Sequence, residues 1–395
     1  MSIISTHYQY LHWLIIALSF SIPISVAISN IFVGFIILYL LIEGNIKQRI
    51  IDSFHHPLGL AIWIFVGWQM VTILWTSGYV NVFKNSYLLL IPFLLTTIKK
   101  ETIRPALLSF VMAMTISEII SYGIFFELFN FKDRTPDDPT PFMTHIQYNP
   151  LLAFSILLLI VMFFQEHQSM RAKIYYAFFA TTMTINMFIT GGRAGQVVFF
   201  ILMTLAALYF LRKHFLKLMA FLILLPIVFI TAYQTSNLFH QRVNLVFEDI
   251  QKFPHDPETS VGRRIFFAQQ SLKLIKEAPI FGHGQGSFPG EYARLSSNSP
   301  FLTVRTCAQP HNQYLLIAVQ NGLIGVILFL NIFIQQMRLF LKAPESEWRI
   351  FQLALPVMFM IICLSDSYIY GHATQLFFVL FSSLLYHRSL IAPKV

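Results

Sequence analysis

A succession of long apolar segments constrains the fold of this 395-residue chain more than any other feature. A membrane-spanning helix needs about 17–25 predominantly apolar residues, and runs of that kind recur along the whole sequence. Only 11% of the residues are charged, whereas an ordinary soluble domain carries roughly a quarter. We therefore expect an all-α polytopic membrane protein.

The apolar runs predict about twelve transmembrane helices. The first two share residues 10–42, a stretch too long for one helix and interrupted near Pro23 and Ser29-Asn30. The other ten are expected at 58–75, 80–98, 105–129, 150–165, 172–190, 194–211, 215–233, 312–335, 350–370 and 373–386. The sequence shows no internal repeat of the kind that marks many secondary transporters.

The distribution of Lys and Arg predicts the orientation, because cytoplasmic connections carry the excess of these residues. Six alternate segments are basic: Lys47 and Arg49; Lys99, Lys100 and Arg104; Arg171 and Lys173; Arg212, Lys213 and Lys217; Arg338, Lys342 and Arg349; Arg388 and Lys394. The short connections between them hold Lys84, Lys132, Arg134 and Arg193. Both termini are therefore expected in the cytoplasm, with the first helix retained as an anchor rather than cleaved as a signal peptide.

One connection on the outer face is long. We expect transmembrane helices 1–9 in residues 1–233, a long loop containing helices at 234–311, and helices 10–12 with a short tail at 312–395. Within the loop, residues 264–276 have helical periodicity. It is the one extramembrane segment large enough to fold over a site.

Two outer-face motifs contain arginine. In TGGRAG, at the start of the eighth span, Gly191 and Gly192 precede Arg193. A guanidinium and the positive end of a helix converge there, an arrangement suited to phosphate. An isolated arginine at this position would equally reach the lipid headgroups. In SVGRR, Arg263 and Arg264 begin an amphipathic helix. Adjacent helical residues diverge by about 100°, so we expect only one of these arginines in a given cleft.

Two further motifs flank the next span. GHGQGSF, with Gly282 and Gly284, follows no buried strand, so we interpret it as a tight turn that brings backbone amides near a ligand rather than as a nucleotide loop. In PHNQYL, His311 stands beside Asn312 and Gln313 at a helix start. A histidine can accept a proton from a hydroxyl near neutral pH, which arginine cannot do.

The order and spacing of GGRAG, SVGRR, GHGQGSF and PHNQYL, between about residues 190 and 330, resemble the O-antigen ligase and polymerase superfamily of membrane glycosyltransferases. The resemblance implies a helical membrane bundle with a long periplasmic loop and a site for a sugar on a polyprenyl diphosphate. It also implies that Arg193 and Arg263 hold the diphosphate, with Arg264 in reserve, and that His311 is the general base.

Other polar groups are weaker candidates. Lys84 would add a cation to the diphosphate pocket, although an interfacial position explains it as well. The THIQY segment at 144–148, and Asp366, Tyr368, Tyr370 and His372, are candidates for the acceptor path. The outer face carries no HExxH, DxD or acidic cluster, and Asp137-Asp138 is remote in sequence from the motifs, so we expect no metal and no other cofactor. Cys307 and Cys363 cannot form a disulfide framework.

These inferences favour an O-antigen ligase, which transfers glycan from polyprenyl (undecaprenyl) diphosphate to the lipid A core at the periplasmic face of the bacterial inner membrane. Nucleic acids and nucleotides are not expected partners. An O-antigen polymerase shares the motifs, but a single large outer loop favours the ligase. A protein O-oligosaccharyltransferase commonly has a further C-terminal domain, whereas this chain ends about nine residues after Tyr386. A transporter or flippase would need intramembrane charges, for which Glu118 is a candidate.

Overall fold

The protein is a bundle of helices. The computed structural model describes residues 3–76, 83–165, 168–253, 255–387 and 390. These residues form sixteen α-helices and four short 3-10 helices, and their only β pairing is one isolated bridge between Thr135 and Asp138. The expectation of an all-α polytopic membrane protein is confirmed.

Each of the twelve predicted spans corresponds to a helix. These helices are α1 (Ile3–Ser21), α2 (Val26–Glu43), α4 (Pro57–Thr72), α5 (Leu90–Thr97), α6 (Ile103–Phe125), α7 (His145–Phe163), α8 (Met170–Ile189), α9 (Arg193–Leu211), α10 (Phe215–Thr235), α14 (Gln313–Lys342), α15 (Arg349–Ile362) and α16 (His372–Leu385). Among the described residues, α2, α4, α6, α7, α9, α10 and α14 are long and apolar enough to cross a membrane. Helices α5, α15 and α16 are apolar but shorter. The prediction for 80–98 begins partly outside the described residues.

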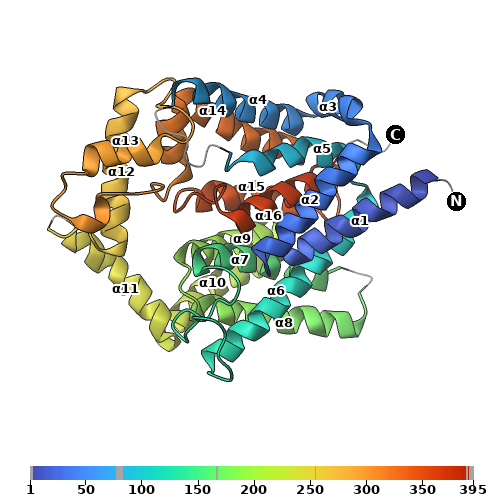
Figure 1. Cartoon of the computed structure of the whole chain (residues 1–395). Helices are drawn as coiled ribbons and strands as arrows, with labels where there is room; N and C mark the ends of the chain where they lie inside the picture. The colour runs from blue at the N-terminus through green and yellow to red at the C-terminus, as the bar shows by residue number, and fades with distance from the viewer. Residues whose placement is uncertain (1–2, 77–82, 166–167, 254, 388–389, 391–395) are drawn as a thin grey trace.

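Four α-helices lie between the spans. Helix α3 (Ile46–Phe54) follows α2, and α11 (Asn237–Lys252), α12 (Ser260–Glu277) and α13 (Phe288–Ser296) lie within residues 234–311. The short 3-10 helices are η1 (Ile73–Trp75), η2 (Ser86–Leu89), η3 (Lys100–Thr102) and η4 (Leu302–Val304). Helices α12 and α13 gather at one end of the bundle, on the left of Figure 1, whereas α3 and the beginning of α1 lie at the other end. The helix predicted over residues 264–276 is confirmed as part of α12.

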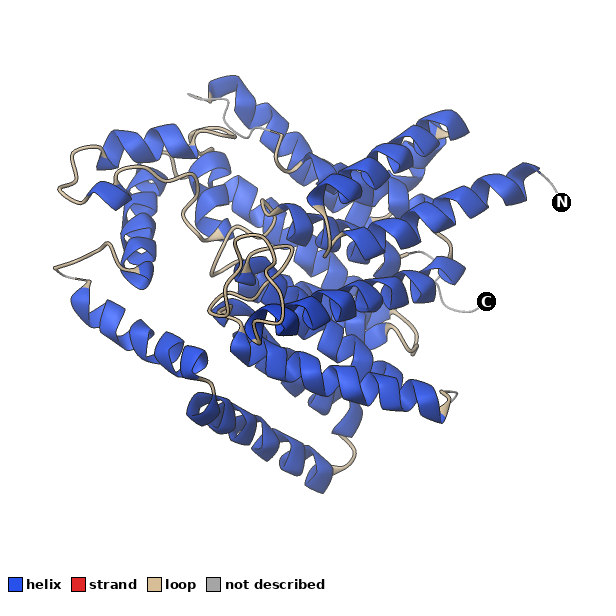
Figure 2. Ribbon diagram, turned by 60° about the horizontal axis from the view of Figure 1, so that its bottom comes forward, coloured by secondary structure: helices blue, strands red, loops and turns tan. Residues whose placement is uncertain are grey.

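Helix α7 lies at the centre of the bundle. All of its residues from 148 to 159 are buried, and it packs most extensively against α8 and α9. In contrast, few residues of α10 are buried, and this helix lies at the edge of the bundle (Figure 2). The fold thus places the beginning of α7 directly against the beginning of α9, where the GGRAG motif lies.

The first apolar stretch breaks once, at Pro23. Helix α1 ends at Ser21, and Ser25 caps α2 by accepting a hydrogen bond from the amide of Ile28. The predicted interruption at Ser29-Asn30 is wrong, because both residues lie inside α2. The Ser29 hydroxyl is satisfied there by the Ser25 carbonyl oxygen at 2.8 Å, so it need not end the helix.

Two other helix boundaries differ from prediction in a way that shapes the site. Helix α7 begins at His145, five residues before the predicted start at Pro150, which lies inside the helix. Proline has no N–H for the carbonyl of Ile146, and that oxygen instead accepts a hydrogen bond from the Tyr368 hydroxyl at 3.1 Å. Helix α15 ends at Ile362 rather than Tyr370, and a turn over residues 363–371 follows it.

Candidate functional site

A cavity of about 840 Å³ lies at the starts of α7 and α9. Helices α11 and α12, the segment before α14 and the turn after α15 form its other walls. It gathers residues from motifs that are far apart in the sequence. Its charged or ionisable lining residues are Arg193, Arg242, Arg263, Arg264, His145, His311, Cys307 and Tyr368. Both of the arginine motifs and the histidine motif identified in the sequence therefore meet at one site.

Arg193 is the first residue of α9, so its cationic side chain is attached at the positive end of that helix. Its Nη2 atom lies 3.4 Å from the Ser260 hydroxyl at the start of α12. The charges of Arg264 and Arg242 repel it, and that of Asp249 attracts it. Several cations held this close create a site that favours an anion.

The glycines of GGRAG permit the close packing of α9 on α7. A Cβ on Gly192 would lie 2.5 Å from the His145 carbonyl oxygen, and one on Gly195 would lie 2.4 Å from Asn149. A Cβ on Gly191 would meet the Arg242 guanidinium at 3.3 Å. Gly192 and Gly195 therefore allow two helix starts to touch, while Gly191 leaves room for a cation.

The side chain of Asn149 of α7 holds the GGRAG turn in place through two hydrogen bonds. Its Nδ2 donates to the Gly192 carbonyl oxygen at 3.2 Å, and its Oδ1 accepts from the Thr190 hydroxyl at 2.7 Å. The Nε2 of Gln196 donates to the Thr190 carbonyl oxygen at 3.2 Å. Buried amides satisfied in this way hold the backbone in one arrangement, and Arg193 is attached to it.

Arg263 and Arg264 both line the cavity. The expectation that only one of them would enter it does not hold, because the cavity wraps around the first turn of α12. Arg263 is exposed and Arg264 is half-buried. The buried carboxylate of Asp249 accepts a hydrogen bond from the Val261 amide at 3.1 Å and so supports this helix start from α11.

Arg242 is a lining residue that the sequence analysis missed. It lies on α11, a helix that was not predicted, on the same face as Val246 and Asp249. The signal was an i, i+4, i+7 pattern that places these three side chains together on a helix.

His311 precedes α14 and points its ring at an acidic partner. Its Nδ1 lies 3.1 Å from Oδ2 of Asp366, which stands in the turn after α15. Asp366 is 6% exposed and also accepts hydrogen bonds from Gln309 Nε2 at 3.2 Å and from the Ser367 amide at 2.7 Å. The ring stacks on Phe267 with a centroid distance of 5.9 Å. This arrangement fixes Nδ1–H toward the carboxylate and leaves Nε2 as the proton acceptor.

His311 adopts a left-handed backbone conformation with φ 52°. The two residues that follow hold it there. Asn312 caps α14 through the Leu315 amide and donates to the Leu364 carbonyl oxygen at 3.0 Å, whereas Gln313 is fully buried and accepts from the Ile369 amide at 3.1 Å. Both residues tie the start of α14 to the turn that carries Asp366.

The GHGQGSF loop does not line the cavity. The amides of His283 and Gly284 donate to the carbonyl oxygens of Val319 and Gln320, both at 2.8 Å. The loop packs where α14 is kinked at Gly322, with φ values of 71° at Gly282 and 100° at Gly284. The amides that were expected near a ligand are therefore used to cover the kink, and the glycines serve its close packing.

Lys84 is also absent from the lining. It is exposed, and its Nζ lies 5.4 Å from the ring centroid of Tyr370, on the other side of the turn after α15. The predicted contribution to the diphosphate pocket is thus not supported by its position. His372 bonds to Asn30, again outside the cavity.

The two cysteines are both free. Burial is the main cause that raises the pKa of Cys307 to about 11, and its thiol donates to the Gln309 carbonyl oxygen at 2.7 Å. This thiol lines the cavity but stays protonated near neutral pH, so it lacks the reactivity of a nucleophile.

Comparisons with known proteins locate the match in the region that builds this cavity. The chain is 29% identical over 217 residues to an uncharacterized protein of Haemophilus influenzae (strain ATCC 51907 / DSM 11121 / KW20 / Rd), and the match covers 52% of this chain and 53% of that protein. The chain thus spans about half the length of the curated relative it matches. Residues 178–330 match the family described as O-antigen ligase. This stretch holds GGRAG, SVGRR and PHNQYL, and its match supports the resemblance of the chain to the O-antigen ligase superfamily.

Proposed function

We propose that this protein is an O-antigen ligase, a glycosyltransferase that moves glycan from a polyprenyl (undecaprenyl) diphosphate to a sugar hydroxyl of the lipid A core. The family match supports this class of enzyme. The observation that carries the proposal is the cavity that holds a histidine–carboxylate pair and four arginines together.

His311 is the proposed general base. Its Nε2 accepts the proton of the acceptor hydroxyl as that oxygen forms a bond to the anomeric carbon of the donor sugar. The bond from the anomeric carbon to the diphosphate oxygen breaks, and its electron pair leaves with the polyprenyl diphosphate. Asp366 stabilises the imidazolium that forms, since its Oδ2 lies 3.1 Å from Nδ1. A general base of this kind contributes about 10²–10⁴-fold.

The arginines are the proposed diphosphate ligands. Negative charge grows on the diphosphate as the anomeric bond breaks, and fixed guanidinium groups stabilise that charge through bidentate hydrogen bonds. Arg193, Arg263 and Arg264 take this role, together with Arg242 of α11. This set of cations provides charge stabilisation without requiring a metal.

A single displacement with inversion at the anomeric carbon fits the lining residues. A double displacement would need a nucleophile, and the Cys307 thiol is protonated near neutral pH because its pKa is raised to about 11. Nδ1 of His311 is hydrogen-bonded to Asp366, and Nε2 is the proposed proton acceptor. The acceptor oxygen is therefore the proposed attacking atom.

The polyprenyl chain has a proposed place beside this cavity. An apolar groove of about 1040 Å³ lies between α8 and α10, floored by α7, and reaches Asn237 and Leu238 at the start of α11. Helix α11 continues from there to Arg242, which lines the cavity. An apolar tail in the groove and a diphosphate among the arginines would thus bind along one helix.

The proposed setting is the bacterial inner membrane, with both termini in the cytoplasm and the site on the periplasmic face. The cations at 47 and 49 lie on α3, at the end of the bundle opposite α12 and α13 (Figure 1). This separation supports residues 234–311 as a periplasmic loop between spans 1–9 and 10–12. The last predicted cytoplasmic cations, Arg388 and Lys394, lie outside the described residues.

A glycan gel of lipopolysaccharide from a deletion strain tests the proposal. A ligase is expected to leave the lipid A core without long glycan while lipid-linked polymer accumulates. A single repeat on the core would identify a polymerase instead. Unchanged lipopolysaccharide with altered glycoprotein would identify a protein O-oligosaccharyltransferase, and unchanged material of both kinds would overturn the assignment to this class.

A further inference from the structure

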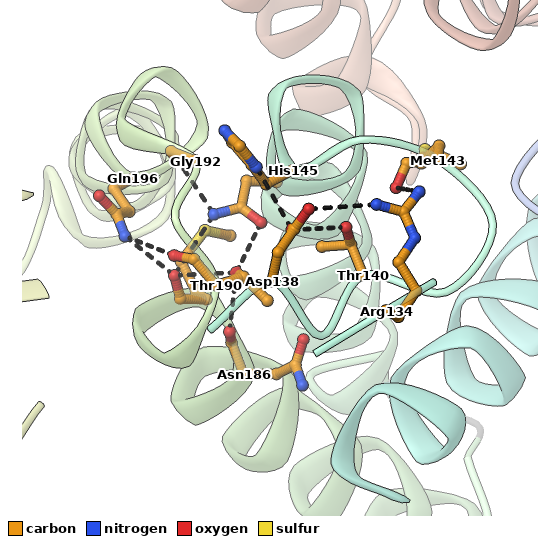
Figure 3. Close-up of polar contacts among 11 residues, drawn as sticks. Arg134, Asp138, Thr140, Met143, His145, Asn186, Thr190, Gly192 and Gln196 are labelled. Atoms are coloured by element: carbon orange, nitrogen blue, oxygen red, sulfur yellow. Dashed lines mark hydrogen bonds and ion pairs between the residues drawn. The ribbon is translucent and has the colours of Figure 1, made fainter. Parts of the chain in front are cut away.

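A second histidine–aspartate pair faces the same cavity. His145, the first residue of α7, lines the cavity, and its Nδ1 lies 3.3 Å from Oδ1 of Asp138 (Figure 3). Asp138 belongs to the loop between α6 and α7 and is thus remote in sequence from every motif of the site. The cavity therefore holds two imidazoles that are each oriented through Nδ1 by a carboxylate.

Asp138 is held in the ionised form. The Thr140 hydroxyl donates to Oδ1 at 3.0 Å, and Nη1 of Arg134 lies 3.1 Å from Oδ2. Burial opposes ionisation, but the hydrogen bonds from His145 and Thr140 and the charges of His145 and Arg134 outweigh it and lower the pKa of this carboxyl. An ionised Asp138 accepts Nδ1–H from His145.

His145 stands beside the GGRAG turn. A Cβ on Gly192 would lie 2.5 Å from the His145 carbonyl oxygen, so the first turn of α7 contacts the residue before Arg193. No hydrogen bond within the described residues engages Nε2 of His145, and the ring borders the cavity. Nε2 of His145 is therefore available to a ligand in the cavity that the arginines also line.

The charges around the cavity determine what Nε2 of His145 would bind. The charged and titratable groups that line the cavity beside His145 are Arg193 of α9, Arg242 of α11, Arg263 and Arg264 of α12, Cys307, His311 and Tyr368. The nearby carboxylates are already engaged: Asp138 by His145, Asp249 by the Val261 amide and Asp366 by His311. An anionic ligand in the cavity thus meets four arginines, and His145 adds a further donor.

We propose that His145 is a further donor-binding residue: its imidazolium donates Nε2–H to an oxygen of the diphosphate while Nδ1–H donates to Asp138. This inference rests on the proposed function, because the diphosphate is the donor's group. This role replaces the expectation that the THIQY segment lines the acceptor path. The proton remains on His145, which separates its role from that of His311, the base toward the acceptor.

The two nitrogens of His145 have separate partners in this proposal, Asp138 for Nδ1 and the diphosphate for Nε2. The side chain of His145→Gln keeps a neutral N–H donor, so this variant should retain part of the donor affinity that His145→Ala loses. The comparison is repeated in a His311→Gln background, because His311 lines the same cavity.

The test is the equilibrium binding of polyprenyl diphosphate to the purified full-length protein in detergent. His145→Ala is expected to raise Kd about tenfold. His145→Gln should bind with intermediate affinity, and Asp138→Asn should also weaken binding, because it removes the carboxylate that orients Nδ1–H. His255→Ala, an exposed histidine outside the cavity lining, is the matched control.

The outcomes separate this inference from the proposed function. If the wild-type protein fails to bind polyprenyl diphosphate, both are overturned. If it binds and transfers glycan while His145→Ala and His145→Gln keep the wild-type Kd, only the role of His145 is overturned. A change confined to the KM of the acceptor would likewise contradict donor binding by His145.

Discussion

The Nδ1 atom of His311 lies 3.1 Å from Oδ2 of Asp366, although the two residues are 55 positions apart in the chain. One precedes α14 and the other follows α15, and the side chains of Asn312 and Gln313 tie these two segments together. The pairing fixes which nitrogen of His311 is free for chemistry. It therefore gives the proposed general base an orienting partner that the motif alone did not identify.

Replacing either member of this pair should reduce the rate of transfer more than the binding of the donor. His311→Ala removes the base, and kcat is expected to fall by about 10²–10⁴. Asp366→Asn should also lower kcat, because an amide that donates to Nδ1 leaves the proton on Nε2. Steady-state rates with a fixed donor and varied acceptor measure this, with thermal unfolding in detergent as the check on folding. A wild-type kcat in Asp366→Asn would contradict the orienting role.

The two arginines of SVGRR should both contribute to donor binding, because both line the cavity. A charge-assisted hydrogen bond is worth about 1.5–3 kcal/mol, so Arg263→Ala and Arg264→Ala are each expected to raise the donor Kd roughly tenfold or more. Arg305→Ala is a suitable control, since its guanidinium binds the Ser299 carbonyl oxygen outside the lining. If one of the two variants binds donor as the wild type does, only the other belongs to the site.

The packing of α9 on α7 should tolerate no added methyl group at Gly195. A Cβ there would lie 2.4 Å from Asn149, and overpacking of this kind costs about 1–3 kcal/mol. Gly195→Ala is expected to lower the thermal unfolding temperature and the donor affinity together, because the same contact positions Arg193. Gly67→Ala in α4 is the matched control, since nothing lies within 4 Å of the added Cβ. Equal unfolding temperatures for the two variants would contradict this account of the packing.

Cys307 should be dispensable for chemistry. A pKa of about 11 leaves only about one thiol in 10⁴ as thiolate at pH 7, and the thiolate fraction rises roughly tenfold for each pH unit until that value is reached. Alkylation by iodoacetamide is therefore expected to be slow at neutral pH and to accelerate with pH. Cys307→Ser should retain activity within a few-fold. Rapid alkylation at pH 7, or a loss of activity comparable to that of His311→Ala, would contradict a single displacement.

The membrane architecture could be predicted from the sequence because each span has its own signal. Apolar length and flanking charge are local properties, and the helices follow them closely. The errors lie where side chains from elsewhere satisfy the backbone. The Tyr368 hydroxyl lets α7 continue through Pro150, and the Asn312 amide bonds the Leu364 carbonyl oxygen beyond the end of α15.

The candidate site was predicted only in part. Arg193, Arg263, Arg264 and His311 stand in motifs that the sequence displays, and the structure brings all four to one cavity. Asp366, Asp138 and Asn149 reach the site through contacts between distant segments, which spacing along the chain does not reveal. Gly282 and Gly284 show the opposite case, because a conspicuous glycine motif serves the packing of a kinked helix instead of the ligand.

The most direct test of the account is reconstituted transfer with purified protein, polyprenyl-diphosphate-linked glycan and lipid A core. The wild-type protein is expected to join glycan to the core, and His311→Ala and Arg193→Ala, folded and inserted normally, are expected to lose at least about 10²-fold in rate. Full-rate transfer by either variant would contradict the central claim that these two residues carry the chemistry of the cavity.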